Sequence, residues 1–128
     1  MWDKSKLISY NDIKNGITPN SITFAEEFGK YLGEGKTKLT TSQLRKFFGE
    51  IKRQQMNGWN KADFILLKPK LAYAVGRANK ENKIKDFYYV LSNAIDQVGN
   101  ETEFDNFVKI FEAIVAYHKA KESGNLEK

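Results

Sequence analysis

Apolar residues recur at intervals of three and four residues through five segments of this 128-residue chain, and no segment alternates convincingly with period two. This spacing predicts an all-α protein, a single compact bundle of about five helices joined by short connections. We expect one helical domain over residues 1–128, with an irregular arm over 1–19, the helical bundle over 20–121 and a frayed tail over 122–128.

The segment from Leu39 to Arg53 (LTTSQLRKFFGEIKR) shows the helical pattern most clearly. Thr40 is a suitable N-cap, and Gln43 three residues later completes a capping box. We expect this helix to continue to about Met56. Its apolar side is formed by Leu44, Phe47, Phe48 and Ile51.

The same reasoning predicts helices over residues 21–32 and 61–78, from residue 81 or 83 to 98, and over 100–121. Thr23 and Glu26 have the spacing of a capping box in the first of these. Pro69 either kinks the helix over 61–78 or marks the start of a separate segment, because proline has no amide donor. Gly76 and the alanines near it predict a close contact between two helices.

The positive charge is concentrated in the middle of the chain. Residues 36–85 contain 13 Lys and Arg against three Asp and Glu, although the net charge of the whole chain is only +5. A basic segment between mildly acidic ones indicates a localised anion-binding surface, for which nucleic acid is the commonest partner. A lysine-rich face that only contacts solvent is the alternative.

One side of the helix predicted from Leu39 is cationic. Arg45 and Lys46 form an adjacent pair, and Lys52 and Arg53 repeat it one heptad later. Gly49 lies between the two pairs. A glycine within a helix costs about 1 kcal/mol relative to alanine, so this position would let a ligand come close to the backbone.

Two aromatic residues have alternative interpretations. Tyr73 lies between Lys70 and Arg77 at helical spacing, which suits a surface that binds phosphate and stacks on a base, or else the margin of a helical bundle. Trp59 follows the Asn57-Gly58 turn, and it either packs on the bundle or stacks on a base.

The sequence contains no catalytic constellation, so we expect a protein that is not an enzyme. The absence of cysteine excludes disulfides, thiol nucleophiles and cysteine zinc sites, and the single histidine, His118, makes a poor metal site. We therefore expect neither a metal nor another cofactor. The chain has no signal-peptide pattern and no apolar run of membrane length, which predicts a cytoplasmic protein without a membrane partner.

Three motifs in order, LTTSQLRKFFGEIKR, LKPKLAYAVGR and FEAIVAYHKAK, closely resemble the small subunit of type III-A CRISPR–Cas effector complexes, the Csm small subunit family. The resemblance covers roughly residues 39–121. It implies an all-helical bundle and a non-catalytic role in antiviral defence.

The resemblance also implies the partners. Several copies of such a subunit stack into a filament beside the backbone and large subunits, and they line the channel in which target RNA pairs with guide RNA. Contacts to RNA are expected mainly at phosphates and riboses, because base pairing reads the sequence.

The residues expected to bind RNA come from two arguments. Arg45 and Arg77 match the family motifs best, and Lys68 and Lys70 lie in the second motif. Helix geometry adds the remaining three. The predicted RNA-binding residues are Arg45, Lys46, Lys52, Arg53, Lys68, Lys70 and Arg77.

Two other functions fit parts of the sequence. A helical DNA-binding regulator would place the second or third helix in a major groove, but the segment that starts with Lys61-Ala62-Asp63-Phe64 offers few base-reading side chains. A protein-interaction scaffold would use the lysines only for solubility and would not contact RNA.

Overall fold

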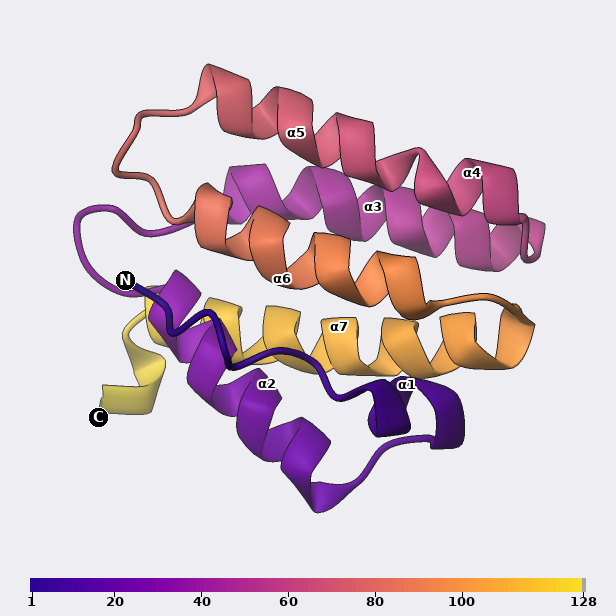
Figure 1. Cartoon of the computed structure of the whole chain (residues 1–128). Helices are drawn as coiled ribbons and strands as arrows, with labels where there is room; N and C mark the ends of the chain where they lie inside the picture. Colours follow the sequence, from indigo (N-terminus) through magenta and orange to yellow (C-terminus); the bar gives the residue numbers. More distant parts are fainter. Residues whose placement is uncertain (128) are drawn as a thin grey trace.

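Seven α-helices and one short 3₁₀ helix make up the regular structure of residues 1–127, the part of the chain that the computed structural model describes (Figure 1). The predicted all-α class is confirmed. The frayed tail predicted over 122–128 stays a prediction, and Lys128 lies outside the described residues. The elements are α1 (Tyr10–Asn15), α2 (Pro19–Leu32), α3 (Thr41–Asn57), α4 (Lys61–Ile65), α5 (Leu67–Arg77), α6 (Ile84–Gln97), α7 (Glu101–Glu122) and η1 (Asn125–Glu127).

The long helix α7 organises the packing, since α1, α2 and α3 all lie against it, while α5 packs on α6 (Figure 1). Phenylalanines fill much of the interior. Phe107 and Phe111 of α7 stack with their ring centroids 6.2 Å apart, and Phe64 of α4 and Phe87 of α6 close the same core.

The segment predicted as one helix over 61–78 is two helices that meet at Leu66. Pro69 is the third residue of α5, where a backbone N–H would have no partner within the helix. Of the two alternatives for Pro69, a separate helical segment is therefore the observed one, and it begins two residues before the proline.

Two helix starts show how capping depends on the exact residue. Thr40 and Gln43 form the predicted capping box of α3. The capping box predicted from Thr23 is wrong, because α2 begins earlier, at Pro19, and Thr18 and Ser21 exchange the capping hydrogen bonds. Proline at the first helical position favours this earlier start.

Close approach of two helices occurs at glycines of α2. A Cβ atom at Gly29 would lie 2.6 Å from the carbonyl oxygen of Ile114, and one at Gly33 would lie 2.8 Å from that of His118. The prediction for Gly76 is wrong, since that residue is exposed and a Cβ there would meet nothing within 4 Å.

The segment before α1 runs along the surface of the bundle and is attached by an aromatic cluster (Figure 1). The Trp2 ring lies 4.8 Å from the Phe28 ring and 5.3 Å from the Tyr31 ring, measured between centroids. Its indole N–H donates to the carbonyl of Lys6, so the ring is fixed in orientation as well as in position.

Candidate nucleic-acid interface

A groove separates α3 from α5 on the basic side of the molecule. It consists of two adjoining hollows, of about 270 and 220 Å³, which share a floor made by Phe47 and Ala74. Lys46 and Arg77 line both hollows, and Lys70 lines the larger one. We call this surface the α3–α5 groove.

Cations and an aromatic ring are exposed together along this groove. The Arg77 guanidinium lies 5.7 Å from the centroid of the Tyr73 ring, and Tyr73 is 65% exposed. The amine of Lys46 forms no ion pair within residues 1–127. The groove therefore offers phosphate-binding groups next to a surface on which a base can stack.

The one carboxylate among the residues that line the groove is that of Glu50, and its negative charge is already balanced by neighbouring cations. Glu50 accepts hydrogen bonds from Arg53 at 2.6 Å, from Gln54 at 3.0 Å and from Lys70 at 3.3 Å. The hydrogen bonds from Arg53 are the main reason that the pKa of Glu50 falls to about 2. Arg53 also pairs with Asp63 at 3.4 Å, so its charge is shared between two carboxylates.

Two of the predicted residues lie on the other side of α3. Lys52 pairs with Glu112 of α7 at 2.8 Å. Arg45 lines a separate hollow of about 190 Å³ between α3 and α7, together with Lys119. The four cations predicted to share one face of α3 thus face different neighbours: α5 for Lys46, α4 for Arg53, and α7 for Arg45 and Lys52.

Lys68 and Trp59 are placed away from the groove. The Lys68 amine pairs with Asp96 of α6 at 2.6 Å. The Trp59 ring packs between Phe64 and Phe104, with centroid distances of 5.4 and 5.2 Å, so of the two interpretations of Trp59 the structure shows packing on the bundle.

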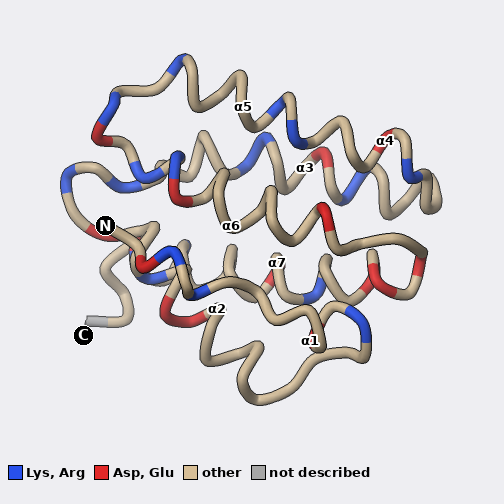
Figure 2. The backbone as a smooth tube through the Cα atoms, viewed as in Figure 1, with Lys and Arg blue, Asp and Glu red and all other residues tan. Residues whose placement is uncertain are grey.

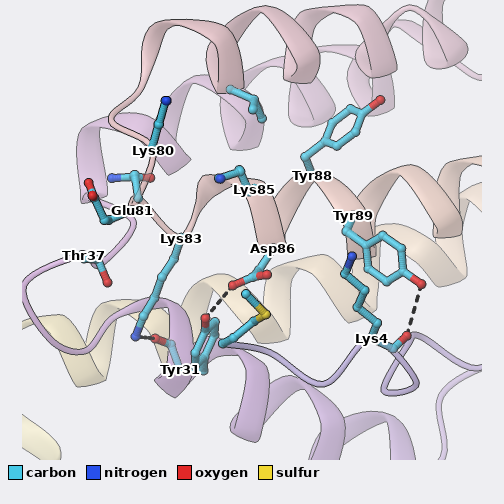
Figure 3. Close-up of a pocket in the computed structure, with 13 residues that line it drawn as sticks. Lys4, Tyr31, Thr37, Lys80, Glu81, Lys83, Lys85, Asp86, Tyr88 and Tyr89 are labelled. Carbon is cyan, nitrogen blue, oxygen red and sulfur yellow. Dashed lines mark hydrogen bonds between the residues drawn. The ribbon is translucent and has the colours of Figure 1, made fainter.

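A second group of lysines was not predicted as a site. Lys80, Lys83 and Lys85 precede or begin α6, and they line a cavity of about 610 Å³ together with Lys4 of the N-terminal arm (Figure 3). The run NKENKIK signalled these cations in the sequence. Nothing local indicated that residue 4 would lie beside them, because the contact spans about 80 residues.

Figure 2 shows the resulting distribution of charge. Lysines and arginines are frequent along α3, α5 and the segments that follow α2 and α5, whereas acidic residues gather near the start of α7. Within residues 1–127 no cluster of His, Asp and Glu has the arrangement of a metal site, and none of the described helices is both long and apolar enough to cross a bilayer.

The family model described as Csm2 Type III-A matches residues 18–124. No curated protein and no solved structure matches the chain.

Proposed function

This chain belongs to the Csm2 family, the small subunits of type III-A CRISPR complexes, and from this premise we propose that it binds the RNA backbone through the α3–α5 groove as a non-catalytic subunit. In this role it lines the channel that holds target RNA and guide RNA, and it contributes to antiviral defence. Its protein partners are the backbone and large subunits and further copies of itself in a filament.

The observation that carries the proposal is the grouping of Lys46, Lys70 and Arg77 around the exposed ring of Tyr73. These residues come from two helices, and Lys46 and Arg77 make no ion pair within the described chain. Cations that no carboxylate neutralises retain their attraction for phosphate, whereas Lys52 and Lys68 already contact Glu112 and Asp96.

Such a surface favours binding that does not depend on RNA sequence. Lysine and arginine contact phosphates, and a tyrosine ring stacks on any base, since every base has a π face. Sequence recognition would then come from base pairing between the guide and target strands, as in other RNA-guided complexes.

The test is binding of the purified chain to single-stranded RNAs of unrelated sequence, measured by fluorescence anisotropy over a range of salt concentrations. We expect similar affinities for all sequences, which fall as salt rises. The double variant Lys46→Glu/Arg77→Glu should bind at least tenfold more weakly. Its salt dependence should be shallower, by about 0.7 in the log–log slope for each phosphate that the variant no longer binds.

The matched control is Lys14→Glu/Lys109→Glu, which changes the net charge equally at two exposed residues that do not line the groove. It should bind within about threefold of the wild type. Equal losses of RNA affinity in both variants would mean that only net charge matters, which contradicts the assignment of RNA binding to the groove.

A single copy can bind weakly, because stacked copies gain affinity from multivalency. If the isolated chain shows no binding, the same variants are compared in the reconstituted complex. An unchanged RNA affinity of the groove variant there would favour the scaffold alternative. A preference for one particular duplex would favour the DNA-binding regulator.

A further inference from the structure

A cavity larger than either hollow of the α3–α5 groove shares no lining residue with that groove. Its walls are the start of α6, the loop before α6, and the N-terminal arm, and its volume is about 610 Å³ (Figure 3). This volume is within the range of small-molecule sites in proteins. The arm contributes Met1 and Lys4, which lie outside the residues matched by the family model.

Some polar groups of the cavity wall already have hydrogen-bond partners within the protein. The Lys83 amine donates to the carbonyls of Tyr31 and Glu34, at 2.7 and 2.9 Å, and lies 4.0 Å from the centroid of the Tyr31 ring. The Tyr31 hydroxyl donates to Asp86 at 2.5 Å. These groups join α2 to α6, and we assign them a structural role.

Other groups in the wall have no partner within residues 1–127. The amines of Lys80 and Lys85 are exposed and form neither an ion pair nor a hydrogen bond there, and the Tyr88 hydroxyl has no hydrogen bond. Lys85 precedes Tyr88 by three residues and Tyr89 by four, so all three lie on adjacent positions of the α6 surface.

Cations and aromatic rings at this spacing match the two parts of a nucleotide. A phosphate held by Lys80 and Lys85 leaves the attached base next to the ring of Tyr88, which points away from the N-terminal arm (Figure 3). Tyr89 is already held by the arm, since its hydroxyl donates to the Lys4 carbonyl at 3.2 Å and the Lys4 amine lies 5.7 Å from its ring centroid (Figure 3).

We propose that this cavity is a second binding site, which takes one nucleoside phosphate with its phosphate on Lys80 and Lys85 and its base against Tyr88. The nucleotide is either free or part of an RNA strand. The proposal is independent of the α3–α5 groove, because the two surfaces have no predicted contact residue in common.

The test is an amide NMR titration of the full chain that carries Lys46→Glu/Arg77→Glu, so that binding in the groove is suppressed. The probes are adenosine monophosphate, inorganic phosphate and a ten-nucleotide single-stranded RNA. We expect adenosine monophosphate or the RNA to shift resonances at the start of α6 and in the arm, with tighter binding than phosphate. Shifts with both probes identify a site for free nucleotides, and shifts with the RNA alone identify a site for a strand.

Three variants test the assigned residues, and Lys109→Glu is their control. Lys85→Glu should weaken binding at least tenfold, whereas Lys109→Glu, an exposed lysine of α7, should change it less than twofold. Tyr88→Leu should weaken binding about fivefold, and Tyr88→Phe should restore it because a ring is again available for stacking. Thermal unfolding checks that each variant is folded.

Three results would overturn the site. The first is that inorganic phosphate binds as tightly as adenosine monophosphate, which indicates an anion site without base recognition. The second is that neither adenosine monophosphate nor the RNA shifts the amide resonances of residues that line the cavity. The third is that a folded Tyr88→Leu variant binds as tightly as the protein without this substitution. In each case the proposed function still stands if Lys46→Glu/Arg77→Glu weakens RNA binding. Failure of the second site is therefore distinguishable from failure of the α3–α5 groove.

Discussion

The carboxylate of Glu122, in the last turn of α7, accepts hydrogen bonds from the backbone N–H and the hydroxyl of Thr41, the first residue of α3, at 3.0 and 2.5 Å. The two residues are 81 positions apart in the chain. The bond from the Thr41 hydroxyl is the main reason that the pKa of Glu122 lies below its ordinary value. A negative charge at a helix start also interacts favourably with the helix dipole.

We predict that Glu122→Gln destabilises the protein by about 1 kcal/mol, since it removes a charged acceptor from the start of α3. Urea unfolding of the variant and the wild type measures this difference. Glu34→Gln is the matched control, because its carboxylate is exposed and accepts no hydrogen bond within residues 1–127, and it should change stability by less than about 0.5 kcal/mol. Equal effects of the two substitutions would contradict the assigned cap.

Acid should weaken the fold through Glu50. Its pKa of about 2 in the folded protein lies below the ordinary value of 4.5, so the folded state favours the ionised form. The resulting stabilisation is fully present above about pH 4.5 and is lost as the pH falls towards 2. Because the ion pairs with Arg53 and Lys70 are partly exposed, the loss should be only about 1 kcal/mol.

The Glu50→Gln variant isolates this contribution. The difference in unfolding free energy between wild type and variant should shrink as the pH falls from 6 to 2.5, measured by urea denaturation at each pH. A difference that stays constant over this range would show that the carboxylate is not stabilised by its neighbours.

The exposed ring of Tyr73 should contribute to RNA affinity by stacking. Tyr73→Ala should lower the affinity for single-stranded RNA roughly fivefold or more, since stacking on one base is worth about 1–3 kcal/mol. Tyr73→Phe should bind as the wild type does, because the ring is retained. Anisotropy titrations at one salt concentration compare the variants. An equal loss of RNA affinity in Tyr73→Ala and Tyr73→Phe would indicate that the hydroxyl, and not stacking of the ring, contributes to binding.

Two glycines within helices should respond oppositely to alanine. Gly29→Ala places a methyl group against the backbone of α7 and should destabilise the protein by about 1–3 kcal/mol. Gly49→Ala, on the exposed side of α3 with nothing within 4 Å, should stabilise it by about 0.5–1 kcal/mol. Thermal unfolding of both variants checks the prediction, and a stable Gly29→Ala variant would contradict the tight α2–α7 contact.

The same Gly49→Ala variant tests whether RNA approaches the backbone of α3. If a strand lies against that position, the variant should be more stable yet bind RNA more weakly in the anisotropy assay. An unchanged affinity would mean that RNA does not contact the backbone there.

The class of the fold and the start of α3 were predictable because they depend on neighbours in the chain. Helical spacing of apolar residues requires only that one side be buried, and Thr40 and Gln43 satisfy each other's backbone amides across three residues. The break at Leu66 was less certain. A proline restricts the backbone, but the sequence alone does not show in which turn of a helix it will lie.

The composition of the candidate site depended on tertiary structure. Periodicity places Arg45 and Lys46 about 100° apart on α3, but it does not say which helix lies opposite each of them. In the folded chain Lys46 faces α5 and joins Arg77, whereas Arg45 faces α7. Charge counting could not separate free cations from paired ones such as Lys52.

Local patterns therefore determine the helices, because capping and periodicity act within a few residues. Only tertiary packing decides which side chains share a surface, because the side chains of Thr41, Lys52 and Lys83 donate hydrogen bonds to residues at least 49 positions away. The tight α2–α7 contact and the cavity beside the N-terminal arm have the same origin. Each is formed by segments that meet only when the bundle closes.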